Sequence, residues 1–207
     1  MFIDGEEIRC QKGFRRLETL SDCQEVPRGA RFLTNFGQLE VRYYAPGIIR
    51  LRIGKDTSPD YGLLVAQPEE MDAQVSEIYP GSYRLEARDD DSALSLDSSP
   101  LRFRLDKGED ILLETVTDRS FLGNLRWMPL ARSNNTWMLS LALKSGTPVY
   151  GLGEKFASLN RRGQLVKSWN CDATTVNAER SYKNVPFAWS PEGWGILIHT
   201  AGCVTHG

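Results

Sequence analysis

Five residues near position 170 combine the side chains that proteins use to bind sugars. Trp169, Asn170, Asp172, Thr174 and Thr175 supply an aromatic ring, an amide, a carboxylate and two hydroxyls within seven residues. Sugar hydroxyls hydrogen-bond to such groups, and a carboxylate makes the stronger, charge-assisted bonds. The same residue types also cap turns, fill strands and pack in cores, so composition alone favours a structural role over binding.

Two other patterns could do chemistry, and each has a simpler interpretation. His199, Cys203 and His206 carry side chains that bind zinc, but their spacing is not that of a zinc finger and a fourth ligand would have to come from Cys171 or elsewhere. The Gly151-Leu152-Gly153 string lacks the third glycine and the following helix of a nucleotide-binding loop. We therefore predict no metal, no cofactor and no nucleotide site.

The elements around these residues are predicted to be strands and one long loop. Residues 149–187 are rich in Gly, Asn, Arg, Thr and aromatic residues and show little alternation, which is typical of a functional loop. Elsewhere apolar and polar residues alternate with a period of two, which predicts β-strands. The clearest runs are 39–43, 49–53, 83–87, 101–105 and 194–199.

The spacing of these runs predicts an all-β fold. Short strands recur about every ten residues with turn residues between them, as in a large antiparallel β-sandwich or barrel. An Ala-Pro-Gly interruption at 45–47 predicts a hairpin between two of the runs. Residues 1–30 are polar and only weakly periodic, which predicts an irregular lead-in with one or two short strands.

Composition limits the classes of partner and the cellular compartments to be expected. The 207 residues include 25 basic and 27 acidic side chains, and this balance gives no reason to expect a nucleic acid or an anionic membrane as partner. The first residues do not have the basic start and apolar run of a secretion signal. We expect a cytoplasmic protein whose four cysteines are free thiols. They are Cys10, Cys23, Cys171 and Cys203.

A set of ordered motifs resembles glycoside hydrolase family 31, the α-glucosidase and α-xylosidase family. The resemblance covers most of the chain, is strong from residue 149 onward and is diffuse before residue 38. Several motifs in the same order are more specific than any one of them. They are VYGLGEKF at 149–156, RRG at 161–163, WN at 169–170 with Asp172 and Thr174, YKNVPF at 182–187, GWGILI at 193–198 and GCVTHG at 202–207, preceded by IRLRI at 49–53 and PLRFRL at 100–105.

This resemblance implies a β-sandwich like that of galactose mutarotase, spanning residues 1–207, followed by a catalytic (β/α)8 barrel. The resemblance also implies that a sandwich loop, at about residues 160–183, reaches over the barrel mouth to the substrate. Asp172 is then the first candidate for substrate contact and Thr174 the second, with Trp169 and Asn170 as supports. The family's nucleophile lies in a barrel string like Asp-Met-Asn-Glu, which does not occur here, so we expect no catalytic residue in this chain. Glu154 is expected to form an ion pair with Arg161 or Arg162 that anchors the loop.

The resulting functional hypothesis is an accessory domain of a retaining α-glycosidase. Its parent would hydrolyse α-linked glucosides or xylosides, and its partners would be the oligosaccharide substrate and the parent's own barrel, with a homo-oligomer left open. Two alternatives remain. A non-catalytic carbohydrate-binding module would bind maltose or isomaltose by itself. An aldose mutarotase would need His and Glu partners in one cleft, whereas the chain has two histidines, both near its C-terminal end.

Overall fold

The computed structural model describes residues 13–57, 61–117, 119–121, 125–172 and 180–207. Its strands pair antiparallel throughout, which confirms the all-β prediction. The chain forms two compact units, each made of two segments. Unit 1 contains residues 1–59 and 66–142, and unit 2 contains residues 60–65 and 143–207. The described part of the chain has no helix long and apolar enough to span a bilayer.

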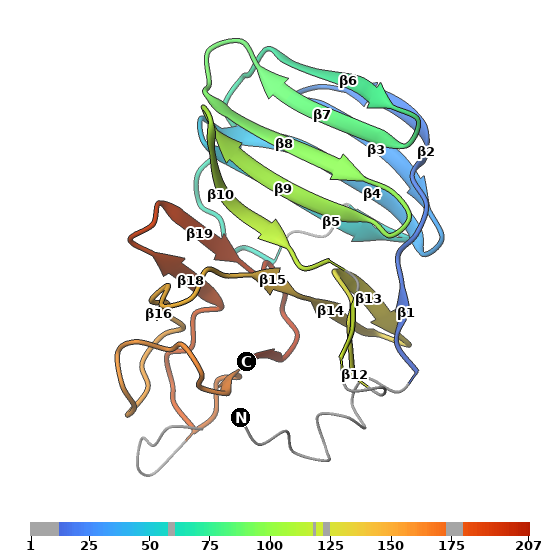
Figure 1. Ribbon diagram of the computed structural model, residues 1–207. Helices are drawn as coiled ribbons and strands as arrows, with labels where there is room; N and C mark the ends of the chain where they lie inside the picture. The colour runs from blue at the N-terminus through green and yellow to red at the C-terminus, as the bar shows by residue number, and fades with distance from the viewer. Residues whose placement is uncertain (1–12, 58–60, 118, 122–124, 173–179) are drawn as a thin grey trace. The chain divides into compact units, whose positions relative to one another are not determined.

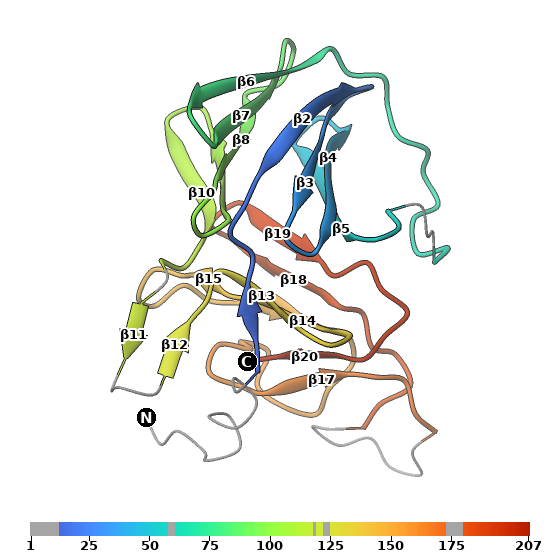
Figure 2. The same ribbon diagram turned by 90° about the vertical axis from the view of Figure 1, so that its right-hand side faces the viewer.

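Two antiparallel sheets of unit 1 form the layers of a sandwich (Figure 1 and Figure 2). The predicted hairpin is present, because β4 and β5 pair from Gln38↔Gly54 to Ala45↔Ile48 and Gly47 takes a positive φ in the turn between them. The four-stranded sheet has the order β2-β3-β4-β5, and the six-stranded sheet has the order β15-β10-β9-β8-β7-β6. The strands of the first sheet are β2 Ser21–Val26, β3 Gly29–Thr34, β4 Gly37–Ala45 and β5 Ile48–Gly54. Those of the second are β6 Ala73–Tyr79, β7 Ser82–Ala87, β8 Ser92–Asp97, β9 Arg102–Lys107, β10 Asp110–Thr115 and β15 Leu141–Ala142.

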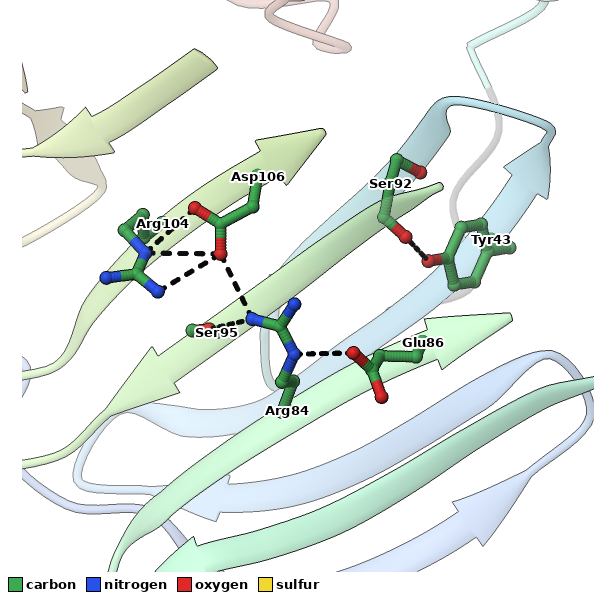
Figure 3. A network of polar contacts seen from close by, with 7 residues as sticks. All are labelled: Tyr43, Arg84, Glu86, Ser92, Ser95, Arg104 and Asp106. Atoms are coloured by element: carbon green, nitrogen blue, oxygen red, sulfur yellow. Dashed lines mark hydrogen bonds and ion pairs between the residues drawn. The ribbon is translucent and has the colours of Figure 1, made fainter. Parts of the chain in front are cut away.

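The period-two pattern explains the core between these sheets. Successive side chains of a strand point to opposite faces, so Leu39, Val41 and Tyr43 of β4 all lie inside and are at most 1% exposed. The Tyr43 hydroxyl donates to the carbonyl of Ser92, which satisfies a polar group that burial would otherwise penalise (Figure 3). The fully buried cluster consists of Leu17, Leu20, Ala30, Phe32, Leu39, Val41, Tyr43, Tyr83, Leu85, Ala87, Leu94, Leu96, Leu101 and Leu130.

The outer face of the six-stranded sheet carries an ion network around one buried carboxylate (Figure 3). Asp106 is 5% exposed. It lies 3.0 Å from Arg84 Nη1 and 2.9 Å from Arg104 Nε, so two cations compensate its burial. Arg84 also donates to Glu86 at 2.6 Å and to the Ser95 hydroxyl at 3.2 Å.

The outer face of the four-stranded sheet has a second buried carboxylate, Glu40, which is 7% exposed. Its Oε2 accepts a hydrogen bond from Arg31 Nη2 and a second from Arg42 Nη2, each at 2.8 Å. Burial by itself would raise the pKa of this carboxyl, but the hydrogen bonds and charges of the two arginines outweigh it and lower the pKa. The two arginines therefore favour the ionised form of Glu40.

The lead-in of the chain is tied to a smaller sheet of unit 1. Its order is β1-β13-β14, in which β1 pairs with β13 through Arg15↔Arg132 and Arg16↔Ala131. The described part of residues 1–30 thus holds β1, β2 and the start of β3, and residues 1–12 lie outside the description. A further hairpin joins β11 and β12. These strands are β1 Arg15–Arg16, β11 Arg119–Phe121, β12 Leu125–Trp127, β13 Leu130–Ser133 and β14 Thr136–Leu139.

The described part of unit 2 contains five short strands in two small sheets. One has the order β16-β18-β19, and the other pairs β17 with β20 through Val166↔His206 and Ser168↔Val204 (Figure 2). The described core of this unit is small and consists of Leu152, Val166 and Ala188, with Val149 and Ile196 packed against them. The strands are β16 Tyr150–Gly151, β17 Val166–Ser168, β18 Phe187–Ser190, β19 Trp194–Leu197 and β20 Val204–His206.

Candidate functional site

Three of the four predicted site residues lie together directly after β17 in unit 2. Trp169, Asn170 and Asp172 are all exposed, and the Trp169 ring is 51% exposed. Asn170 forms an isolated parallel bridge with Ser181, so the segment after β17 and the segment before β18 meet at this point. Thr174, the fourth predicted residue, lies outside the described residues.

The two glycines of the Gly-Leu-Gly string allow backbone segments to approach closely. Gly151 and Gly153 have φ values of +100° and +78°, a region that side-chain-bearing residues rarely adopt. A Cβ on Gly151 would lie 2.3 Å from the carbonyl oxygen of Phe187, and one on Gly153 would lie 2.2 Å from that of Lys183. The string therefore packs directly on the chain that enters β18.

Arg161 and Arg162 stabilise this region through carbonyl groups. Arg161 is 6% exposed and donates to the carbonyls of Gly151 at 3.2 Å and Ser158 at 3.0 Å. Arg162 donates to the carbonyls of Lys144 and Thr147. The expected ion pair with Glu154 is wrong: within the described ranges no ion pair joins Glu154 to either arginine, and its carboxylate is exposed. The bonds to these carbonyls orient both guanidinium groups toward the backbone, and the structure places no carboxylate in ion-pair contact with them in its described part.

Lys155 is the other buried cation of the region. It is 8% exposed, and its Nζ donates to the carbonyl of Lys167 in β17 at 2.9 Å. Burial lowers the pKa of this ammonium group, and the charge of Arg161 lowers it further. Lys155 thus fixes the end of β17, directly before the residues at 169–172.

The sequence analysis assigned no role to Lys155 or Asn184, and the ion pair that it assigned to Arg161 or Arg162 is absent. Lys155, Arg161 and Asn184 lie inside the recognised motifs, but the role of such a cation or amide is evident only when its carbonyl partners are known. One feature of the sequence could have indicated these supporting residues, namely charged residues inside a glycine-rich apolar motif. Burying a charged side chain without a partner is costly, so such residues are expected to have hydrogen-bond partners.

The exposed side chains of this segment could bind a sugar. An exposed indole and an exposed carboxylate suit the face and the hydroxyls of a sugar. Glycoside cleavage needs two carboxylates on opposite sides of one bond, and the segment of Trp169, Asn170 and Asp172 supplies one.

The structure also separates the residues considered for zinc. The His199 ring packs edge-on against Tyr61 at 5.5 Å, whereas His206 belongs to β20 and is opposite Val166. Cys203 is an exposed free thiol. Across the parts of the chain that the structure describes, no group of three or more His, Cys, Asp or Glu side chains could hold a metal ion.

A β-sandwich together with an exposed segment of Trp, Asn and Asp side chains has the features of a domain of a carbohydrate-active enzyme. Residues 38–205 match the family model described as the glycosyl hydrolase 31 N-terminal galactose mutarotase-like domain. The match extends over both units and more than half of the chain. The chain therefore belongs to this family, and the resemblance seen in its motifs is confirmed.

Two curated relatives match parts of the chain. An α-xylosidase of Emericella nidulans is 40% identical over 68 residues, which is 33% of this chain and 9% of the relative. The α-xylosidase XylQ of Lactiplantibacillus pentosus is 44% identical over 50 residues, which is 24% of this chain and 6% of the relative. The matched stretches are thus small parts of much longer proteins.

Solved structures share the fold at lower identity. A family 31 dextranase of Flavobacterium johnsoniae has a TM-score of 0.67 and 19% identity, covering 89% of this chain and 22% of its own. The cycloalternan-forming enzyme of Listeria monocytogenes has a TM-score of 0.71 and 15% identity, covering 93% of this chain and 18% of its own. The chain therefore spans about a fifth of the length of these structural neighbours.

Proposed function

We propose that this chain is the N-terminal domain of a retaining α-glycosidase that hydrolyses α-linked glucosides or xylosides. In this proposal the domain packs on a catalytic (β/α)8 barrel supplied by the rest of the parent protein. The segment at 169–172 contributes to the sugar-binding site, with Asp172 as the main contact and Trp169 and Asn170 beside it. The α-xyloside is the first substrate to test, because both curated relatives are named α-xylosidases.

The observation that carries the proposal is that Trp169 and Asp172 are exposed, while hydrogen bonds hold the segment that contains them. Buried Lys155 donates to the carbonyl of Lys167, two residues before Trp169, and the Asn170–Ser181 bridge holds the segment that contains them. A carboxylate in such a position gains strength as a hydrogen-bond acceptor once a covering surface removes water from it. A barrel mouth would provide that surface.

The number of exposed hydrophobic side chains in unit 2 supports the barrel as a partner. Apolar side chains that gather on a surface mark an interaction site. In the described part of unit 2 the large hydrophobic side chains that are at least 39% exposed are Tyr61, Leu63, Val65, Phe156, Leu159, Leu165, Trp169, Tyr182, Val185, Phe187 and Trp189.

The test is steady-state kinetics of the full-length parent protein on p-nitrophenyl α-xyloside and α-glucoside. Asp172→Asn is expected to raise KM by about tenfold or more, because it removes a charge-assisted bond to the substrate. Asp110→Asn, an exposed aspartate of unit 1, is the matched control and should leave KM unchanged. Absence of α-glycosidase activity in the wild-type protein would refute the proposal.

The stereochemistry of the first product gives an independent check. A retaining enzyme releases the α-anomer before mutarotation sets in, which proton NMR of early time points detects. Initial release of the β-anomer would show an inverting mechanism and contradict the proposal.

A carbohydrate-binding module is the second candidate, and the half-exposed Trp169 ring beside Asp172 favours it. It predicts that the 207-residue chain binds maltose or isomaltose by itself, whereas the accessory-domain proposal predicts almost no binding because half of the site is elsewhere. Titration calorimetry with both sugars, repeated with Trp169→Ala, separates the two.

We also propose a cytoplasmic location. Cys23, Cys171 and Cys203 are free thiols, and free thiols persist in a reducing compartment. Cell fractionation followed by thiol labelling of the natural protein tests this, and recovery of the protein from a secreted fraction would contradict it.

A further inference from the structure

One asparagine side chain joins the segment that contains Asp172 to the segment that leads into β18. The Asn184 Nδ2 group donates to the carbonyl of Trp169 at 2.9 Å, to Asn170 Oδ1 at 2.9 Å and to the carbonyl of Ser181 at 3.0 Å. Its Oδ1 accepts from the Ser181 hydroxyl at 3.1 Å. Both ends of a single amide are therefore used, and three acceptors surround its nitrogen.

The backbone adds further bonds across the same junction. The Asn184 N–H donates to Asn170 Oδ1 at 2.8 Å, and the Cys171 N–H donates to the carbonyl of Ser181 at 3.2 Å. Ser181 is fully buried, although the two segments it joins lie mostly at the surface. The junction thus holds Trp169, Asn170 and Cys171 in one arrangement immediately before Asp172.

The backbone at Lys183 and Asn184 is also held by the segment at Gly153 and Glu154. The Glu154 N–H donates to the carbonyl of Lys183 at 2.8 Å. The Cβ position of Gly153 lies 2.8 Å from Asn184 Cα, a distance that only a glycine allows. A run of direct contacts therefore leads from the Gly-Leu-Gly string through Lys183 and Asn184 to the residues before Asp172.

We propose that Asn184 is a positioning residue that sets the placement of Asp172 for sugar binding. This inference rests on the proposed function. Asn184 touches no substrate in this proposal; it acts through Trp169 and Asn170, whose placement determines where the next carboxylate projects. The requirement is for a donor at the Nδ2 position, because three acceptors converge there and any replacement that brings an acceptor would repel them.

The first test is Asn184→Asp in the full-length parent protein. Aspartate has the same shape but replaces the donor with an oxygen that faces three acceptors. We expect kcat/KM on the α-glycoside substrate to fall about tenfold or more, mainly through KM. Ser181→Ala removes only the hydroxyl that donates to Asn184 Oδ1 and keeps every Nδ2 bond, so its kcat/KM should fall less than about threefold. This milder variant keeps the test informative if Asn184→Asp folds poorly.

Asn35→Asp in unit 1 is the matched control. The Asn35 amide also joins two backbone groups, because it donates to the carbonyl of Arg16 and accepts from the Glu18 N–H, each at 3.1 Å. The same chemical change there should lower stability and leave KM unchanged. An equal rise in KM for Asn35→Asp and Asn184→Asp would show general loss of structure and overturn the inference.

A double-mutant cycle separates positioning from a merely structural role. If Asn184 acts through Asp172, then Asn184→Asp should change KM little in a protein that already contains Asp172→Asn. Additive effects of the two substitutions would overturn the inference while leaving the proposed function intact. If Asp172→Asn alone left KM at the wild-type value, the loop role in the proposed function would fail and the positioning role with it.

Hydrogen–deuterium exchange gives a readout that does not depend on activity. Asn184→Asp should speed exchange of the Cys171 and Asn184 amides, which are bonded across the junction, with no change in the strands of unit 1. Faster exchange together with an unchanged KM would show a junction that does not position the substrate contact, and would overturn the inference.

Discussion

The two units of this chain are stabilised in different ways. Unit 1 encloses a cluster of fourteen buried side chains between two sheets, whereas the described core of unit 2 has three. Unit 2 relies instead on Lys155, Arg161, Arg162 and Asn184, whose side chains donate to backbone carbonyls. The stabilisation from hydrophobic burial increases with the apolar area that is buried. Because the core of unit 2 is small, more of its stability must come from hydrogen bonds and from surface that a partner covers.

The largest expected effect comes from truncating a buried leucine of unit 1. Leu94→Ala should cost about 3 kcal/mol, the sum of lost apolar transfer and the cavity left behind. Leu152→Ala in unit 2 removes an equally buried side chain, each being 2% exposed, yet should cost about 2 kcal/mol because its small core can collapse more easily. Local hydrogen-exchange free energies in the full-length protein measure both. Equal losses would contradict the contrast between the units.

A methyl group at Gly153 tests the close packing of unit 2. Gly153→Ala should cost about 2 kcal/mol, because the residue has a positive φ and its Cβ would collide with the carbonyl of Lys183. Gly146→Ala is the control: its φ is +81° but nothing lies within 4 Å of its Cβ position, so only about 1 kcal/mol of backbone strain is expected. Exchange rates of unit 2 amides provide the measurement, and equal costs at the two glycines would show that the collision is relieved.

The buried carboxylate Glu40 gives unit 1 a defined pH dependence. Its pKa is lowered in the folded state, so its stabilisation is present above the unfolded-state pKa and is lost as pH falls through the folded-state pKa. Glu40→Gln should cost about 1.5 kcal/mol near pH 7. The difference from the wild type should shrink as pH falls below about 4.3, the usual value for glutamate. Denaturant unfolding at several pH values tests this, and a difference independent of pH would refute it.

The smallest effect is expected at an exposed ion pair. Arg102 and Asp97 are 3.4 Å apart and their side chains are 39% and 43% exposed. Arg102→Ala should change the unfolding free energy by less than about 0.5 kcal/mol. The same denaturant titration measures this change. A loss above about 1 kcal/mol would contradict the prediction and show that an exposed ion pair contributes substantially to the unfolding free energy of unit 1.

The strands of unit 1 could be predicted well because alternation directly encodes which face of a sheet is buried. Leu39, Val41 and Tyr43 were predicted to share a face, and all three are in the core. The Pro-Gly interruption likewise predicted the turn between β4 and β5. In both cases a local pattern is sufficient, since it does not depend on which distant segment packs against it.

The contacts that support the candidate site could not be predicted, because they join residues that are distant in the sequence. The loop prediction grouped Trp169, Asn170 and Asp172, but no local pattern indicated that Asn184 donates to Trp169 and Asn170. The ion pair expected for Glu154 was wrong, because Arg161 and Arg162 donate to backbone carbonyls and no local pattern shows which carbonyls lack a partner. The assignment of residues 60–65 to unit 2 likewise comes only from the structure, since this short segment has no periodicity.

The two-segment composition of unit 2 has a consequence for synthesis on the ribosome. Residues 60–65 leave the ribosome before most of unit 1 exists, but the rest of unit 2 begins only at residue 143. At the usual rate of translation this short segment must wait on the order of ten seconds for its partners. Unit 1 can complete its sheets during that delay, so slow translation after residue 142 would lengthen the time for which residues 61–65 remain without the rest of unit 2 and accessible to chaperones.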